Sequence, residues 1–342
     1  MIDFDSSESH VLLNPRLSED ERARLEALAP KLEGHVFVAT SGTTGALKLV
    51  ALSKRAILAS AAAVNARLNA MHDDVWSHVL PPFHVGGLGI YARAHLAGSR
   101  VIPLPWDANT FASTDATLAS LVPAQVHDLV RAALKPPPRM RAILVGGGAF
   151  DPDLQREARA LGWPVLATYG MSECASTVVV EGVLLDHLEA RREENGRLAF
   201  RGASLFAGYA TEDGLVDPKV DGWFVSDDFG EVEGRGVRIF GRGSDFAKVG
   251  GESVDLLRLD AIARAVGGEN VGVVAMPDER LGEVIHLAVT RDSDMICDAF
   301  NSRVAPFERA RAVHVVEAIP RSALGKLQRA RLMEMIRSWN TR

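Results

Sequence analysis

Residues 40–48 bring together two glycines, four hydroxyl side chains and a lysine in the sequence Thr-Ser-Gly-Thr-Thr-Gly-Ala-Leu-Lys. Glycine allows a backbone to come close to an anion because no Cβ stands in the way, and successive amide N–H groups can then point at phosphate oxygens. The hydroxyls add donors and an oxygen that suits Mg²⁺. We interpret this stretch as a phosphate-binding loop, with a polar turn as the alternative. The residues predicted to contact phosphate are Thr40, Ser41, Gly42, Thr43, Thr44, Gly45 and Lys48.

The segments on either side of this loop would position it. Residues 35–39 form an apolar run typical of a strand, and residues 54–70 form a helical run rich in alanine. The pattern therefore predicts a strand, a glycine-rich loop and a helix, an arrangement that holds phosphate. The spacing of the glycines and Lys48 differs from the Walker A pattern Gly-x-x-x-x-Gly-Lys-Ser/Thr, so this is not a loop of that kind.

Three further glycine-rich stretches are predicted at the ends of strands. They are residues 81–89, 146–149 and 169–173, with strands at about 75–80, 141–145 and 165–169. Helices are predicted between the strands, including residues 115–121 and 123–134. Alternating strands and helices indicate an α/β sheet with a site at the carboxyl ends of its strands. In the first stretch, His84 is either a site residue or a packed histidine with a local partner.

Composition limits the class of protein. The chain has 342 residues, of which 47% are hydrophobic, enough for a large core and two domains. Its net charge of −6 gives no electrostatic case for a nucleic-acid partner. The two cysteines, Cys174 and Cys297, lack metal-ligand spacing, and no apolar run is long enough to span a bilayer. The first ten residues are acidic and polar, so we expect a reduced, cytoplasmic protein.

The character of the sequence changes twice along the chain. Residues 178–241 read as short strands separated by turns, which predicts a small β-rich subdomain. Residues 243–342 return to mixed helices and strands and are predicted to form a separate C-terminal α+β domain. The boundary at residues 242–245 is a plausible hinge, so residues 1–242 would form the large domain.

Five motifs occur in sequence between residues 40 and 326. Their order and residues resemble those of the adenylate-forming superfamily of acyl-CoA synthetases, luciferases and nonribosomal adenylation domains. The motifs are the loop at 40–48, residues 147–149, residues 169–173, residues 222–230 with the hinge start at 241–242, and residues 320–326. The sequence departs from the family at Leu47, where proline is usual, at Asp227, where glycine is usual, and at Ser244, where an acidic residue is common. Only 39 residues precede the phosphate loop, so we expect part of the acyl pocket wall to be missing.

The resemblance implies a fold, a reaction and a set of residue roles. It implies an α/β fold with a large N-terminal adenylate-forming domain and a small mobile α+β C-terminal domain. A carboxylate would attack the α-phosphate of ATP to give acyl-AMP, and the thiol of coenzyme A would then displace AMP. The implied catalytic residues are Lys326, which bridges carboxylate and α-phosphate, Glu173, which binds Mg²⁺, and His84, beside the acyl pocket. The implied nucleotide contacts are Gly147, Gly148, Ala149, Tyr169, Gly170, Ser172, Asp228 and Arg242, and Gly250 and Gly251 would approach coenzyme A.

Within the superfamily, residues 82–88 and 250–252 are most similar to the o-succinylbenzoate–CoA ligases of menaquinone biosynthesis. Two alternatives stay open. In the first, the chain is an adenylating enzyme that acts on another aromatic or aliphatic acid or loads a carrier protein. In the second, it is a nucleotide-binding homologue without catalysis. Retention of Lys326, Glu173 and Asp228 disfavours the last. A homodimer is one possible assembly, because short chains of this type often pair.

Overall fold

The computed structural model describes residues 2–41, 47–148, 150–249, 252–278, 281–291, 294–321 and 327–339. Contacts divide the chain into two compact units. The first consists of Met1–Ser226 and Gly230–Ile239, and the second of Asp227–Phe229 and Phe240–Arg342. Mobility of the second unit remains a prediction.

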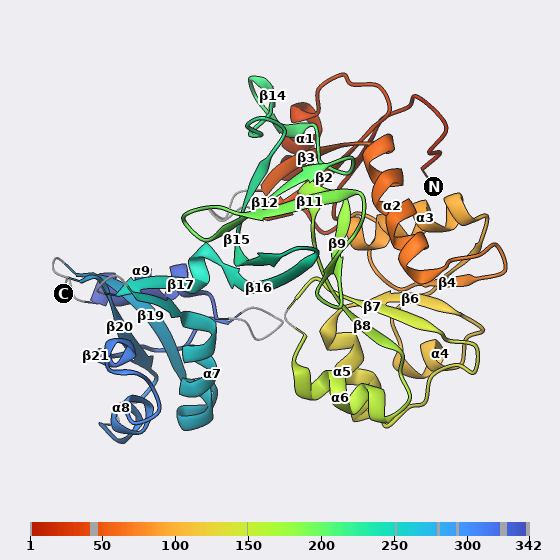
Figure 1. Ribbon diagram of the computed structural model, residues 1–342. Coiled ribbons are helices and arrows are strands. Elements are labelled where there is room, and N and C mark those ends of the chain that lie inside the picture. Colours follow the sequence, from red (N-terminus) through yellow and green to blue (C-terminus); the bar gives the residue numbers. More distant parts are fainter. Residues whose placement is uncertain are drawn as a thin grey trace. The chain divides into compact units, whose positions relative to one another are not determined.

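The first unit contains an eleven-stranded sheet with a parallel half (Figure 1). Its parallel strands, in spatial order, are β5 (Arg100–Pro103), β4 (Val75–His78), β6 (Leu118–Leu121), β7 (Ala142–Val145) and β8 (Val165–Met171). Every residue of β4, β6 and β7 is buried, because helices cover both faces of a parallel sheet. The carboxyl ends of these strands therefore meet at one edge of the sheet.

Alternate side chains of these strands pack on different helices. Leu118, Ala142 and Leu144 share a core with α2 (Lys54–Leu68) and α3 (Val85–Ala97). Ala119, Leu121, Ile143 and Val145 pack instead on α5 (Pro123–Arg131) and α6 (Pro152–Ala160). A short helix, α4 (Ala108–Ala112), buries Phe111 in this second core. The two-residue period of the strands places one set of side chains on each face.

The prediction of a helix at residues 115–121 is wrong, because Leu118–Leu121 is strand β6. The strand lies between β4 and β7 in the middle of the parallel sheet. Its sequence, Leu-Ala-Ser-Leu, suits a helix as well as a buried strand. Burial between two sheet neighbours decided the outcome, since tertiary contacts override local propensity.

The other half of the large sheet is formed by later strands. These are β9 (Ser176–Val180), β10 (Val183–Leu184), β16 (Gly236–Arg242), β15 (Phe224–Glu233), β12 (Arg197–Gly202) and β11 (Leu188–Arg192), in spatial order. β9 runs antiparallel to β8 and joins the two halves. Most of the short strands in residues 178–241 therefore extend the large sheet. Two strands within this range, β13 (Gly208–Thr211) and β14 (Gly214–Val216), join a second sheet instead.

The second sheet carries the predicted phosphate loop. Its strands are β1 (His10–Leu12), β2 (His35–Ser41), β3 (Leu47–Ser53), β13 (Gly208–Thr211) and β14 (Gly214–Val216), in that order. Helix α1 (Glu19–Leu28) begins after its N-cap residue Ser18, whose side chain accepts from the Glu21 amide. In the hairpin of β2 and β3, Thr40 lies opposite Lys48.

This hairpin corrects the predicted strand–loop–helix order. Strand β3 lies between the loop and α2, so the loop joins two antiparallel strands. The residues Leu49, Val50, Ala51 and Leu52 are completely buried. This run pairs with β2 on one side and β13 on the other, which favours a strand over an extension of the helix.

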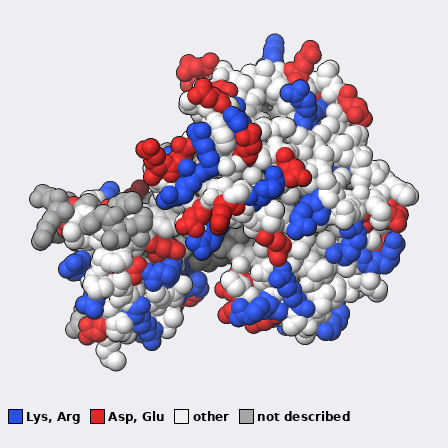
Figure 2. Space-filling model, viewed as in Figure 1, with Lys and Arg blue, Asp and Glu red and all other residues white. Residues whose placement is uncertain are grey.

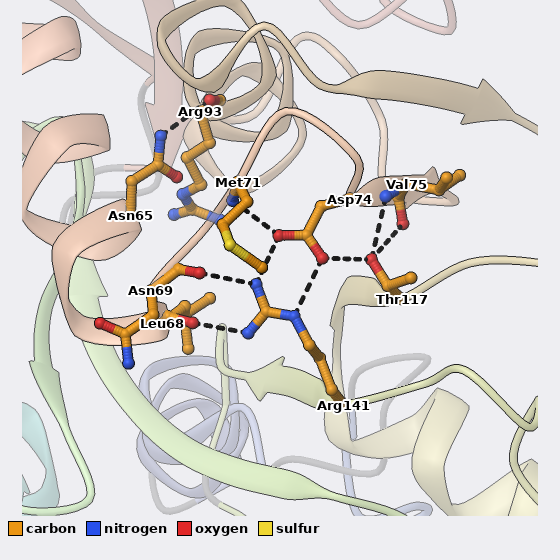
Figure 3. Close-up of polar contacts among 9 residues, drawn as sticks. All are labelled: Asn65, Leu68, Asn69, Met71, Asp74, Val75, Arg93, Thr117 and Arg141. Carbon is orange, nitrogen blue, oxygen red and sulfur yellow. Dashed lines mark hydrogen bonds and ion pairs between the residues drawn. The ribbon is translucent and has the colours of Figure 1, made fainter.

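An ionic cluster around the buried Asp74 carboxylate fixes the end of α2 to the parallel sheet (Figure 3). The Asp74 carboxylate accepts from Arg141 Nε at 2.9 Å and Thr117 Oγ1 at 2.7 Å. Arg141 also donates to the Leu68 carbonyl at 2.6 Å and the Asn69 carbonyl at 3.1 Å. Arg141 thereby satisfies carbonyls that the helix leaves without partners at its C-terminus.

The second unit is an α+β fold. Its strands are β17 (Phe246–Val249), β18 (Glu252–Asp255), β19 (Val271–Asp278), β20 (Gly282–Val289) and β21 (Ala310–Val315). Helices α7 (Leu256–Gly267) and α8 (Asp294–Asn301) contribute to one core, and α9 (Arg329–Trp339) contributes to another. Short 3₁₀ turns occur in this unit at η2 (Gly243–Asp245), η3 (Gly268–Asn270) and η4 (Pro306–Glu308), and in the first unit at η1 (Ser172–Cys174).

Candidate functional site

The carboxyl edge of the parallel strands brings three predicted stretches to one side of the first unit. Residues 79–84 follow β4, residues 146–148 follow β7, and residues 169–173 end β8. Gly147 has φ +77° and is exposed, so its backbone can adopt a turn that other residues rarely allow. Thr168 Oγ1 donates to the Val145 carbonyl at 2.9 Å and links the ends of β7 and β8. Sequence spacing predicted this convergence correctly.

The backbone at Gly170 has a steric reason to be glycine. The pairing of β8 with β9 is irregular between Tyr169 and Gly170. A Cβ at Gly170 would lie 1.9 Å from the Ser176 carbonyl oxygen, which no side chain could tolerate. The half-buried Tyr169 ring lies 6.1 Å from that of Phe200 and belongs to the edge of the core. Its predicted adenine contact stays a prediction.

Glu173 and Lys48 meet at a third residue, Tyr209. The Tyr209 hydroxyl donates to Glu173 Oε1 at 2.8 Å, and the Lys48 ammonium lies 5.1 Å from the centre of the Tyr209 ring. The main chain holds Glu173 as well, because its carbonyl accepts from the Phe206 amide at 2.8 Å. Two predicted site residues, 125 positions apart, are thus joined by a tyrosine on β13.

Sequence reasoning missed Tyr209. It lies in a strand opposite Val50 of β3, and only the pairing of β13 with β3 places it beside residues 40–48. No short motif around it indicates that pairing. A glycine next to an aromatic residue in a short strand was the only local signal, and it is typical of many strands.

His84 is the N-cap residue of α3 and is exposed. Its ring lies 4.7 Å from that of Phe83, and the atoms packed around it desolvate it enough to lower the pKa of His84. The nearby His78 is buried, and burial lowers its pKa too. An open pocket of about 420 Å³ is lined by residues 78–82 and 103–105 beside this segment. His84 is not among the residues that line this pocket, and its role beside the acyl pocket stays a prediction.

Arg93 is a second residue that sequence reasoning missed. Its side chain is 2% exposed, and it donates to the hydroxyl oxygens of Ser120 at 3.1 Å, Ser176 at 3.3 Å and Thr177 at 3.1 Å. Among the residues that the structure describes, no carboxylate pairs with it. Burial lowers the pKa of Arg93 to about 10, so it stays charged at neutral pH. A buried charge with only neutral partners is costly, which marks this position as a candidate anion site.

The other predicted residues lie in several elements of the two units. Asp228 is buried on β15 and belongs to the second unit by its contacts. Ser172 is half-buried in η1. Arg242 ends β16, and its side chain, like that of Ser41, is not among the described atoms. The predictions for Gly42, Thr43, Thr44, Gly45, Ala149, Gly250, Gly251 and Lys326 lie outside the described residues.

The surface and the described helices limit other roles. On the face in Figure 2, Lys and Arg alternate with Asp and Glu and form no large patch of one sign. No helix within the described ranges combines the length and apolar character needed to cross a membrane.

Comparison with solved structures gives the fold. The chain matches E. coli MenE with a bound phenylether-linked analogue of OSB-AMS at TM-score 0.70 and 27% identity, covering 89% of this chain and 69% of that one. It matches ATP-bound MatB from Rhodopseudomonas palustris at TM-score 0.71 and 26% identity, covering 87% and 67%. The predicted fold class is therefore confirmed.

Sequence comparison gives the family. A probable 2-succinylbenzoate–CoA ligase from Mycobacterium tuberculosis is 32% identical over 328 residues, which cover 87% of this chain and 83% of that protein. A 2-succinylbenzoate–CoA ligase from Bacillus cytotoxicus is 28% identical over 89% of this chain and 70% of that protein. The pattern of the family described as AMP-binding enzyme matches residues 35–205. The chain belongs to the family of AMP-binding enzymes.

Proposed function

We propose that this protein is an ATP-dependent acid–CoA ligase whose acid is 2-succinylbenzoate. In the first half-reaction the acid attacks the α-phosphate of ATP and releases pyrophosphate, which gives an acyl-AMP. In the second, the thiol of coenzyme A attacks the acyl carbonyl and AMP leaves. Similarity to 2-succinylbenzoate–CoA ligases over most of both chains supports the reaction.

The observation that carries the choice of acid is the buried guanidinium of Arg93. The acid 2-succinylbenzoate has two carboxylates, and only one of them is activated. The other stays charged and needs a cation if it leaves water. Arg93 offers a charged fork whose described partners are hydroxyls. A Cβ at Gly89 would lie 3.3 Å from Arg93 Nη2 and 3.4 Å from Ser176 Oγ, so glycine leaves room for the guanidinium and its hydroxyl partner.

The charge of the triphosphate is the main problem of the first half-reaction. Residues 40–48 would supply amides, hydroxyls and the Lys48 ammonium to the phosphates, and Ser172 would donate to the α-phosphate. Lys326 would bridge the attacking carboxylate and the α-phosphate. Placed charges of this kind typically contribute roughly 10²–10³ in rate. Tyr169, Gly170 and residues 147–149 would contact adenine, and Asp228 and Arg242 the ribose.

Glu173 suits Mg²⁺ in combination with phosphate. No cluster of three His, Cys, Asp or Glu side chains in the described part of the chain could hold a metal ion by itself. In nucleotide sites Mg²⁺ commonly takes one or two carboxylates and completes its octahedron with water and substrate phosphates. Glu173 is half-buried, with Oε1 bonded to Tyr209, and would supply that carboxylate. The ion would neutralise phosphate charge.

The second half-reaction needs a different surface from the first. Gly250 and Gly251 would let the backbone approach the pantetheine of coenzyme A. The second unit cannot present both Lys326 and these two glycines to the same acyl group at the same time. We infer that residues 243–342 rotate between the two steps, a motion common in enzymes that assemble their site by domain movement.

ATP–pyrophosphate exchange, with and without coenzyme A, tests the proposal. The acids compared are 2-succinylbenzoate, benzoate and a straight-chain dicarboxylate. We expect exchange to be much faster with 2-succinylbenzoate than with benzoate or the straight-chain dicarboxylate, and a thioester to form once coenzyme A is added. Exchange that favours benzoate would refute the acid, exchange without thioester would favour a carrier protein as acceptor, and absence of exchange with any acid would refute the ligase.

A further inference from the structure

Tyr209 makes two different contacts at the candidate nucleotide site. Its hydroxyl donates to Glu173 Oε1 at 2.8 Å, and its ring face carries the Lys48 ammonium 5.1 Å from the ring centre. Both partners have proposed roles toward the triphosphate, whereas Tyr209 has none. We propose that Tyr209 is a positioning residue that holds the metal-binding carboxylate and the phosphate-binding ammonium apart and aligned. This inference rests on the function proposed above.

The ring of Tyr209 is itself held in place. It packs edge-on against Phe206 with ring centres 4.9 Å apart, and Phe206 is only 1% exposed. The Lys219 ammonium lies 4.8 Å from the Phe206 ring and donates to the Phe206 carbonyl at 2.8 Å. The backbone of Tyr209 pairs with Val50 on one side and Val216 on the other. The tyrosine is therefore a fixed platform.

The platform separates two groups that attract one another. A glutamate and a lysine this close to a common residue would readily form an ion pair. In such a pair the carboxylate would be less available to Mg²⁺ and the ammonium less available to phosphate. Within the described part of the chain, Lys48 and Glu173 form no such pair. The ring holds the ammonium through its electron-rich face, and the hydroxyl holds one carboxylate oxygen. Among the described residues, no side chain pairs with the second carboxylate oxygen or with the ammonium, so both can meet a metal ion and phosphate.

Two substitutions separate the contacts. Tyr209→Phe removes the hydrogen bond to Glu173 and keeps the ring for Lys48, whereas Tyr209→Leu removes both. We expect Tyr209→Phe to raise the half-saturating Mg²⁺ concentration by about 3- to 10-fold, the scale of losing one intramolecular hydrogen bond, with little change in KM for ATP. Tyr209→Leu is expected to raise KM for ATP as well. Pyrophosphate release, measured against Mg²⁺ and against ATP, gives both values.

Glu173→Gln and a double variant distinguish failure of this inference from failure of the proposed function. If Glu173→Gln leaves the Mg²⁺ dependence unchanged, the metal role of Glu173 is wrong. If Glu173→Gln changes that dependence and Tyr209→Phe does not, only the role of Tyr209 is overturned. In the Glu173→Gln background, Tyr209→Phe is expected to add little, because coupled residues are not additive. Full additivity would contradict a shared role.

Tyr91→Phe is the matched control. Tyr91 is a half-buried tyrosine on α3 whose ring packs against His78 at 4.4 Å. It should leave the Mg²⁺ dependence as in the wild type. A melting temperature for each variant identifies loss of fold. An equal Mg²⁺ shift in Tyr91→Phe and Tyr209→Phe would mean a general effect of removing a hydroxyl and would overturn the proposal.

Discussion

Arg329 and Asp245 lie 84 residues apart in the sequence and form a buried ion pair, with Nη1 2.7 Å from Oδ1. Both residues are less than 9% exposed. Arg329 Nη2 also donates to the Leu256 carbonyl at 2.8 Å. Asp245 ends η2 in the predicted hinge segment, and Arg329 begins α9 three positions after Lys326. The predicted hinge segment and the start of α9, which follows the segment of Lys326, are thus connected through the Arg329 guanidinium.

Arg329→Met should destabilise the second unit, because it leaves the Asp245 carboxylate buried without its cation. Breaking a buried pair from one side typically costs about 3–5 kcal/mol. Hydrogen exchange of amides in β17 and α7 would measure the loss. Arg331→Met is the matched control, since Arg331 is exposed two positions away, and surface changes are usually within about 0.5 kcal/mol. Equal protection in both variants would show that the pair contributes nothing.

The Asp74 cluster predicts how stability depends on pH. Burial alone would raise the pKa of Asp74, but hydrogen bonds from Arg141, Met71 and Thr117 and the charge of Arg141 lower it to about 2. A carboxylate whose pKa is depressed by folding stabilises the protein above its unfolded pKa, near 3.9. That stabilisation should be lost as pH falls from about 4 to about 2.

Asp74→Asn tests this prediction by urea unfolding at several pH values. The variant should be less stable than the wild type at pH 7, and the difference should shrink as the pH falls below about 4. Asp73→Asn is the control, because Asp73 is the exposed neighbour. A difference that stays constant from pH 7 to pH 2.5 would mean that the charge of Asp74 does not stabilise the fold.

Local patterns predicted the strand ends and glycine turns well, because each depends on residues that are neighbours in sequence. The turn at Gly147, directly after β7, is an example. Strand β6 was missed because Leu118–Leu121 is a strand only through its two sheet neighbours. Arg93 and Tyr209 were missed for the same kind of reason, since their partners come from other elements and no short motif contains them.

Lys326→Ala should abolish formation of acyl-AMP but spare thioester formation from added acyl-AMP and coenzyme A. The reason is that only the first half-reaction brings a carboxylate to a polyanion and needs an extra positive charge between them. Pyrophosphate release and thioester formation, followed separately, measure the two steps. Lys31→Ala, at an exposed position on the first unit, is the control. Pyrophosphate release at the wild-type rate would exclude Lys326 from this role.

Arg93→Met should weaken use of 2-succinylbenzoate more than use of an acid with one carboxylate. Removing one partner of a buried charge pair costs at least about 2 kcal/mol, so kcat/KM for the dicarboxylate should fall by about 30-fold or more. Arg93→Lys keeps the charge but loses the planar fork that holds a carboxylate at two points, and should fall between the wild type and Arg93→Met.

The monocarboxylate benzoate is the internal control for these Arg93 variants, since a general packing defect would affect both acids alike. The guanidinium also joins Ser120 of β6 to Ser176 of β9, so a melting temperature accompanies each measurement. A dicarboxylate-specific loss at unchanged melting temperature would place the second carboxylate at Arg93. An equal loss for benzoate and 2-succinylbenzoate would instead mean that Arg93 only joins α3 to the sheet, because its charge would then make no distinction between the acids.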